Sequence, residues 1–231
     1  MRKILVFLCV LISLVAAGEF KWARASFHTG EGEPESDALE VRSDDLIFLN
    51  MLEKVTSIKV IKKVDVVNVN NLSQMIKYPF TFFSAQHFVK FSDQEIKNIR
   101  EYLDRGGFIF QDDCVEASGK WQDNARSGDN FFQSFKNEIE TRVYPDGKMV
   151  KLDKNHEIFN CFYSFPEGLP HFQGVRNGAW AYFDKDGRMK VLANSGDIHC
   201  GWHNDPYWLG EEKHHEMLKM AANIVIYALT H

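Results

Sequence analysis

The chain has 231 residues, of which 45% are hydrophobic and 26% charged, and its formal net charge is −5 with the histidines neutral. This composition is that of a globular protein and excludes an intrinsically disordered one. The mild acidity argues against a nucleic-acid partner, because proteins that bind nucleic acid present a basic face to the phosphates.

Residues 1–18 have the features of a secretory signal peptide: Arg2 and Lys3 at the start, an apolar run, and the small residues Ala16-Ala17-Gly18 at a cleavage site. The apolar run is too short to span a membrane comfortably, and an uncleaved anchor is the alternative. We therefore predict an exported protein, periplasmic or extracellular, with a single domain over residues 19–231 and no transmembrane segment after cleavage.

The chain has four cysteines, and Cys9 lies within the leader, so an odd number remains: Cys114, Cys161 and Cys200. Export permits disulfides, but at least one of these thiols must be free or pair with another molecule. Their spacing does not fit a zinc ribbon, which needs close cysteine pairs. We expect three reduced, partly buried thiols.

The first half of the sequence alternates between strand and helix patterns. Helical spacing of apolar residues predicts a helix that begins near Ser43. Apolar runs bounded by turn residues predict strands at 20–27, within 57–69 and at 79–84.

The most clearly defined unit is a helix at 92–104 followed at once by a strand at 108–111. Ser92 and Glu95 have the spacing of a capping box, and Gly106 supplies the left-handed stop. Strand, helix and strand in this order predict a right-handed parallel crossover.

The second half is predicted to contain a helix at 129–143, a loop at 145–155, a hairpin of strands 180–183 and 189–193, and a closing helix at 213–229. Combined with the parallel crossover, these elements predict an α/β domain with a mostly parallel sheet flanked by helices and a hairpin near the C-terminus.

Asp112 and Asp113 follow the strand at 108–111 and should lie at the carboxyl end of a parallel strand, where open α/β sheets bind ligands. Alternation sends neighbouring side chains of a strand to opposite faces, so at most one of the two follows the strand into a pocket. His87 follows the preceding strand and should reach the same edge. We predict a pocket built from His87, Asp112, Asp113 and Asp197; the alternative is that the two aspartates only cap local turns.

The segment 197–205 is dense in metal-ligand types, including His199 and His203. Their spacing suits a metal only on a helix, and Gly201 and Pro206 argue against one. A polar loop that forms part of a pocket wall is the other interpretation, and His156 is a further candidate for that wall.

Several motifs are absent from the sequence: a Gly-x-Ser-x-Gly elbow, a Walker loop, a His-Glu-x-x-His pair and a Gly-x-Gly-x-x-Gly turn. Their absence argues against nucleotide binding and standard serine hydrolysis.

The chain resembles the family called domain of unknown function 4159 from about Phe20 to Thr230. The resemblance is carried by Tyr78-Pro79-Phe80 leading to His87, by Gly106-Gly107-Phe108 leading to Asp112-Asp113, by 155–159, by Asp197 before Gly201-Trp202, and by 223–230.

That family is grouped with class I glutamine amidotransferase-like and ThuA-like proteins, so the resemblance implies a flavodoxin-like three-layer fold. In true amidotransferases the nucleophilic cysteine sits just after the strand equivalent to 108–111. Cys114 lies near that place, but no Gly-x-Cys-x-Gly elbow surrounds it, which argues against glutaminase activity. Gln86 stands where the family tends to have glycine, and could crowd a small ligand near His87.

The preferred hypothesis is a non-enzymatic binding module for a small polar ligand such as a saccharide, or for an envelope partner protein. Its ligand-contacting residues would be Gln86, Asp112, Asp113, His156, Asp197 and Trp202, with Trp202, Tyr207 and Trp208 as exposed aromatics. No cofactor is expected.

The alternative is a hydrolase, either acid–base or metal-assisted. In it Asp112 or Asp113 is the general base, His87 its partner, and His199 and His203 the metal ligands. A structural role in a cell-envelope complex is a third option.

Overall fold

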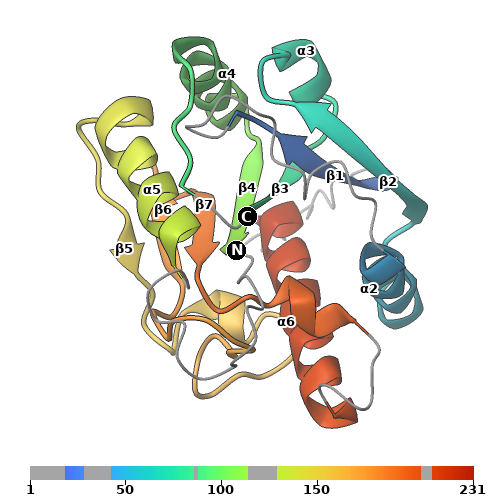
Figure 1. Cartoon of the computed structure of the whole chain (residues 1–231). Helices are drawn as coiled ribbons and strands as arrows, with labels where there is room; N and C mark the ends of the chain where they lie inside the picture. The colour runs from blue at the N-terminus through green and yellow to red at the C-terminus, as the bar shows by residue number, and fades with distance from the viewer. Residues whose placement is uncertain (1–18, 29–42, 86–87, 114–128, 204–209) are drawn as a thin grey trace, which may run out of the picture.

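The fold is known from a computed structural model that describes residues 19–28, 43–85, 88–113, 129–203 and 210–231. Seven strands form one sheet in the order β2-β1-β3-β4-β7-β6-β5 within this part of the chain (Figure 1). The strands are β1 Phe20–Ser26, β2 Val60–Asn68, β3 Phe80–Ala85, β4 Phe108–Asp113, β5 Val150–Lys151, β6 Trp180–Phe183 and β7 Met189–Asn194.

Five helices of the α type flank this sheet in the described residues, together with short turns of π- and 3₁₀-helix. The α-helices are α2 Ser43–Val55, α3 Leu72–Met75, α4 Asp93–Asp104, α5 Asn130–Glu138 and α6 Glu211–Thr230. The short turns are η1 Ile139–Val143 (π), η2 Glu157–Phe159 (3₁₀) and η3 His199–Trp202 (3₁₀).

The sheet is mostly parallel. β2, β1, β3, β4 and β7 are mutually parallel neighbours, whereas β6 and β5 pair antiparallel at the edge. β7 therefore serves both as a strand of the parallel sheet and as the second arm of the predicted hairpin. The predicted α/β class with a mostly parallel sheet is confirmed.

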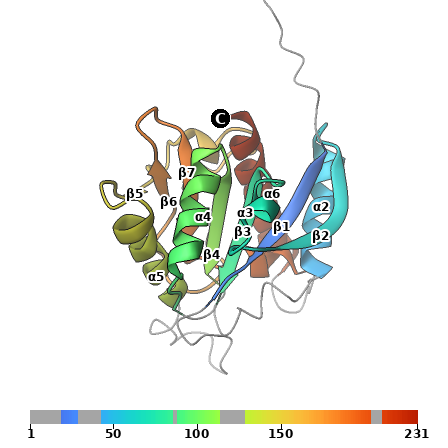
Figure 2. The same ribbon diagram turned by 90° about the horizontal axis from the view of Figure 1, so that it is seen from above.

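Side chains alternate between two apolar layers, one on each face of the sheet. Phe82 and Phe110 pack with α2 and α6, whereas Phe83 and Ile109 pack with α3, α4 and α5. The helices accordingly lie on both sides of the strands (Figure 2). Because aromatic rings bury large areas, the many phenylalanines account for much of both layers.

The helix predicted at 92–104 is confirmed as α4. The Ser92 hydroxyl accepts from the Glu95 N–H at 3.2 Å, and the Glu95 carboxylate accepts from the Ser92 N–H at 2.8 Å, so the capping box is present. Gly106 ends the helix with φ of 100°, a value that favours glycine. β3, α4 and β4 form the predicted parallel crossover.

Three predictions of local structure are wrong in detail. The loop predicted at 145–155 contains β5, which is only two residues long and pairs with β6. The helix predicted over 129–143 is α-helical to Glu138 and π-helical from Ile139. The loop predicted over 197–205 contains the turn η3, which tertiary contacts hold in place.

Cys161 is free and half-buried, Cys200 is half-buried as well, as predicted, and Cys114 lies outside the described residues. Across the described parts of the chain, no helix combines the length and apolarity needed to cross a membrane.

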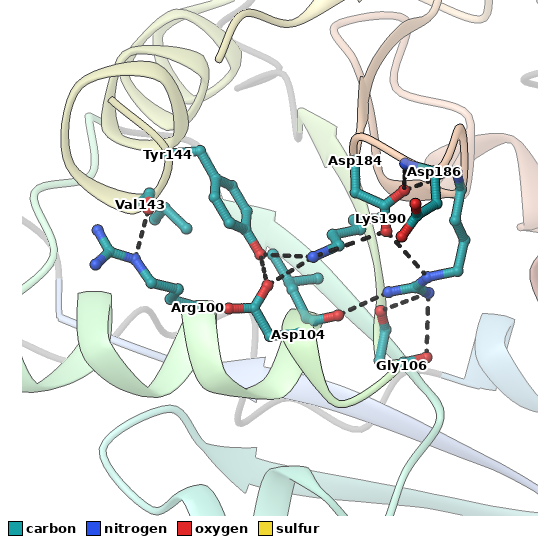
Figure 3. Close-up of polar contacts among 11 residues, drawn as sticks. Arg100, Asp104, Gly106, Val143, Tyr144, Asp184, Asp186 and Lys190 are labelled. Carbon is teal, nitrogen blue, oxygen red and sulfur yellow. Dashed lines mark hydrogen bonds and ion pairs between the residues drawn. The ribbon is translucent and has the colours of Figure 1, made fainter. Parts of the chain in front are cut away.

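A polar network closes the edge of the sheet where the parallel strands begin (Figure 3). Lys190 of β7 is 7% exposed, and its Nζ donates to Asp104 Oδ1 at 2.6 Å and to the Tyr144 hydroxyl at 3.3 Å. The Tyr144 hydroxyl also donates to Asp104 at 2.7 Å. The Arg188 guanidinium donates to the Leu103 carbonyl at 2.6 Å. The network therefore ties the end of α4 to the hairpin.

We predict that Lys190→Met lowers the free energy of unfolding by about 1–2 kcal/mol at pH 7, because the variant loses charged hydrogen bonds. Burial alone would raise the pKa of the Asp104 carboxyl, but the bonds from Lys190 and Tyr144 outweigh it and hold the pKa below its ordinary value. The stabilisation from these bonds is present above the pKa that an aspartate has in the unfolded chain. It is lost as the Asp104 carboxylate protonates. The difference in unfolding free energy between wild type and Lys190→Met should therefore shrink below about pH 4. Urea denaturation across pH measures it.

Lys148→Met is the matched control, because the Lys148 side chain is 70% exposed and lies 3.9 Å from Glu140. Its effect should stay within about 0.5 kcal/mol. Equal losses in the two variants would show that the Lys190 network adds nothing specific.

Candidate functional site

The opposite edge of the sheet, where the parallel strands end, carries a row of polar residues. Ser84 of β3 pairs in register with Asp112 of β4, and Asp112 pairs with Asn194 of β7. All three are buried, with exposures of 4%, 0% and 0%. Such an edge is where open α/β sheets place their ligands.

Asp112 points to the face of the sheet that α2 and α6 cover. Its Oδ2 accepts from the backbone N–H of His199 at 2.7 Å and lies 2.9 Å from His199 Nδ1. Its Oδ1 has no hydrogen-bond partner among the described residues. One carboxylate oxygen therefore fixes both the backbone and the ring of His199.

The His199 ring is held between carboxylates on one side and two potential nucleophiles on the other. Nδ1 lies 3.3 Å from Asp197 Oδ1, in addition to the Asp112 contact. Nε2 lies 3.4 Å from the Ser84 hydroxyl and 3.7 Å from the Cys200 sulfur. This network assigns the proton to Nδ1, which leaves the lone pair of Nε2 facing the hydroxyl and the thiol.

The turn before η3 brings Asp197 to this ring. Asn194 Oδ1 accepts from the Gly196 N–H at 2.8 Å, and Asn194 Nδ2 donates to the Gln111 carbonyl at 3.2 Å. Asp197 has φ of 50°, and a carboxylate oxygen accepts from the Gln173 side chain. A non-glycine residue in this region is uncommon, and such backbone strain is concentrated at functional sites.

Asp113 points to the other face of the sheet, as alternation predicts. Its Oδ2 accepts from the Phe132 N–H at the start of α5 at 3.0 Å, and the side chain is fully buried. Burial is the main cause that raises the pKa of this carboxyl well above its ordinary value, and the nearby charges of Asp112 and Asp197 raise it further. Only Asp112 of the predicted pair therefore joins His199.

Gln111 is a polar residue of the site that the sequence did not single out. It is fully buried on the same face as Asp113, and neither its Oε1 nor its Nε2 has a partner among the described residues. Buried amides nearly always form hydrogen bonds, which makes the Gln111 side chain an unusual feature of this edge of the sheet. A glutamine at the end of an otherwise apolar strand was the available signal.

The two histidines predicted as metal ligands lie in different surroundings, and their role in metal binding stays a prediction. Ligand atoms of Asp197, His199 and Cys200 lie within 4.8 Å of one another, a set that could hold a divalent ion. His203 is not part of this set, and its Nδ1 instead lies 3.0 Å from Asp44 Oδ1 at the start of α2.

Two residues predicted to contact a ligand, Trp202 and His156, pack against aromatic rings of the fold. The expectation that Trp202 is exposed is wrong, because its side chain is 0% exposed and stacks on Phe48 with ring centroids 4.8 Å apart. His156 caps η2 and packs on Phe183 and on Tyr227 near the C-terminal end of α6. Phe183 pairs with Met189 where β7 begins, at the opposite edge of the sheet from Asp112.

Gln86, His87, Cys114, Tyr207 and Trp208 lie outside the described residues. Their roles stay predictions.

A buried ion pair, also missed from the sequence, fixes α2 beside the site. Arg24 Nε lies 2.6 Å from Asp45 Oδ2, and Arg24 Nη2 donates to Asp45 Oδ1 at 3.0 Å. The guanidinium lies 5.2 Å from the centre of the Phe82 ring. Such two-point pairing suits arginine and orients the helix start against β1.

We predict that Asp113→Asn stabilises the protein at pH 8 by about 1–2 kcal/mol. The raised pKa means that the folded protein keeps a proton that the unfolded chain releases above about pH 4. Wild-type stability must therefore fall as the pH rises from there toward the folded pKa. The stability advantage of Asp113→Asn over wild type should grow between about pH 4 and the folded pKa of Asp113, and it should vanish below about pH 4.

Urea denaturation at several pH values measures this difference, with the exposed Asp186→Asn as the control. Parallel curves for wild type and Asp113→Asn would contradict the assignment.

Comparison with known proteins gives one family. None of the curated proteins matches the sequence. A family profile described as a domain of unknown function (DUF4159) matches residues 28–229, which is most of the chain and includes every residue of the His199 site. The chain therefore belongs to the DUF4159 family.

Proposed function

We propose that the protein is a hydrolase in which His199 transfers the proton and Asp112 orients it. The observation that supports this proposal is that Asp112 Oδ2 contacts His199 twice. It accepts from the His199 N–H at 2.7 Å and lies 2.9 Å from His199 Nδ1. A base held by a buried carboxylate, with a nucleophile at its second nitrogen, is the arrangement of covalent acyl-transfer enzymes. The hypothesis of a hydrolase is retained here, with His199 in the role first considered for His87.

Cys200 is the proposed nucleophile. Its sulfur lies 3.7 Å from His199 Nε2 and the residue is half-buried, whereas Ser84 is only 4% exposed within β3. A thiol is also intrinsically more nucleophilic than a hydroxyl.

In the proposed reaction the thiol proton passes to Nε2 and the sulfur attacks a carbonyl carbon. The leaving group takes that proton as its bond to the carbonyl carbon breaks. Water then hydrolyses the thioester, and the thiol regains its proton. Asp112 keeps the imidazole oriented throughout.

The finer fold class and the compartment belong to this proposal. The parallel strand order β2-β1-β3-β4-β7 supports a flavodoxin-like fold, and with it a relationship to class I glutamine amidotransferase-like and ThuA-like proteins. The leader-like residues 1–18 support export to the periplasm or beyond.

A second candidate is metal-assisted hydrolysis, favoured by the set Asp197, His199 and Cys200. The bond between a ligating histidine and a carboxylate such as Asp112 is usual at metal centres. The binding module first favoured loses the aromatic platform at Trp202, so its saccharide ligand has less support.

We predict that iodoacetamide alkylates Cys200 faster than Cys161 at pH 7, and that Asp112→Asn and His199→Gln each slow Cys200 at least about tenfold. The reason is that His199, when correctly oriented, accepts the thiol proton. Burial raises the pKa of the Cys161 thiol, which makes it an internal reference. Peptide mapping by mass spectrometry reads each cysteine separately.

Asp44→Asn is the matched control, since it removes a carboxylate–histidine contact of 3.0 Å with His203 at the same edge. Its Cys200 rate should stay within about twofold of wild type. Equal reactivity of Cys200 and Cys161, or insensitivity to both test variants, would exclude the proposed dyad.

Metal analysis tests the second candidate. If the ion is held by the described set, purified protein carries stoichiometric zinc that Cys200→Ser and Asp197→Asn lose and His203→Ala keeps. Zinc that depends on His203 would contradict this ligand set.

A further inference from the structure

A cavity of about 370 Å³ lies beside the His199 site, at the edge of β5 and β6. Lys151 of β5 pairs with Trp180, the first residue of β6, and Trp180 pairs with Ala193 near the carboxyl end of β7. The cavity is therefore at the same end of the sheet as Asp112. Its volume is within the range of sites for small molecules.

The charged lining of this cavity is mainly positive. Lys151, Lys154 and Arg176 line it, against Asp153 and Glu167. Lys154 lies 3.7 Å from Glu167, but both side chains are well exposed, so that pair is weak.

The carboxylate of Asp153 is engaged elsewhere, since Oδ1 accepts from Asn155 N at 2.8 Å and from Asn155 Nδ2 at 2.7 Å. Neither Lys151 nor Arg176 forms an ion pair with any carboxylate of the described residues. The lining thus includes two cations, Lys151 and Arg176, that form no ion pair within the described residues.

Two further basic groups stand next to Arg176. Burial lowers the pKa of Lys213 below its ordinary value, and Arg176 lowers it further, while Glu216 only partly compensates. Burial is also the first cause that lowers the pKa of His171. The Gly174 carbonyl opposes that effect, and Arg176 and Lys213 add to it. These groups repel one another, which is the electrostatic condition that a bound anion relieves.

His171 adds an unused polar atom to the lining. Its Nε2 lies 3.2 Å from the Gly174 carbonyl, whereas its buried Nδ1 has no hydrogen-bond partner among the described residues. The His171 ring as a whole is only partly buried. Its protonation therefore responds both to charge in the cavity and to the surrounding basic groups.

We propose that this cavity binds the anionic group of a small molecule, a phosphate or a carboxylate, with Arg176 and Lys151 as the charged contacts. The planar guanidinium binds both groups through two parallel hydrogen bonds, and the ammonium adds a point charge. Because the lysines and Arg176 reach solvent, the site suits a compact, hydrated anion. The inference depends on the cavity alone and not on the proposed hydrolase.

The test is a pH titration of the His171 ring by NMR at constant ionic strength, with inorganic phosphate, acetate or uncharged glycerol added. A bound anion should raise the midpoint of the His171 titration by at least about 0.5 pH unit, since a nearby negative charge favours the imidazolium. Glycerol should leave the midpoint unchanged. The stronger of the phosphate and acetate responses identifies the anionic group.

A second experiment compares Arg176→Gln and Lys151→Gln with the control Arg105→Gln. Arg105 is already paired with Glu101 at 2.7 Å. The first two should weaken phosphate or acetate binding at least about tenfold, and Arg105→Gln should not. No response of His171 to either anion, or equal weakening in all three variants, overturns the proposal. Neither readout uses catalytic activity, so failure of the hydrolase would leave the result interpretable.

Discussion

The structure depends on how one buried carboxylate, that of Asp112, is satisfied. A charged group without water must be paired or hydrogen-bonded, and the partner available to Asp112 is the start of η3. Asp112 Oδ2 accepts a hydrogen bond from the His199 N–H at 2.7 Å, and this bond holds η3 against the carboxyl end of β4. Gly201 then lies so close to α6 that a Cβ there would be 2.3 Å from Met217, and Trp202 turns into the core. The same contact therefore positions the His199 imidazole and, through Gly201, the closing helix.

The two ends of the sheet differ in how their polar groups are satisfied by the described residues. At the end where the strands begin, Lys190, Arg188 and Tyr144 find partners in the carboxylate of Asp104 and the carbonyls that finish α4. At the end where they finish, Gln111 and Asp113 keep buried polar atoms without described partners, and Asp197 has a strained backbone. The two edges therefore contrast within the described residues: the first is closed by paired charges, and the second carries buried polar atoms and a residue with positive φ.

The sequence could predict what depends on near neighbours. The capping box of α4, the stop at Gly106 and the parallel crossover all follow from residues a few positions apart, and alternation along β4 correctly separates Asp112 from Asp113. Contacts between residues far apart in the chain could not be predicted from the sequence. The Asp112–His199 bond joins residues 87 positions apart, and Trp202 appeared exposed because a polar segment surrounds it in sequence. His156 was misplaced for the same reason: its neighbours Phe183 and Tyr227 are distant along the chain.

The turn that follows β7 links the proposed dyad to the cationic cavity. Gly196 lines the cavity, and its carbonyl accepts from the N–H groups of Phe172 at 2.9 Å and Gln173 at 3.2 Å. The Gln173 side chain donates to Asp197, whose other oxygen lies 3.3 Å from His199 Nδ1. The cavity therefore borders the same short segment that sets the second carboxylate beside the imidazole. Hydrogen bonds between Gly196 and Gln173 and between Gln173 and Asp197, with the carboxylate–imidazole contact that follows, are a contiguous path along which the proposed anion site and the proposed dyad could be coupled.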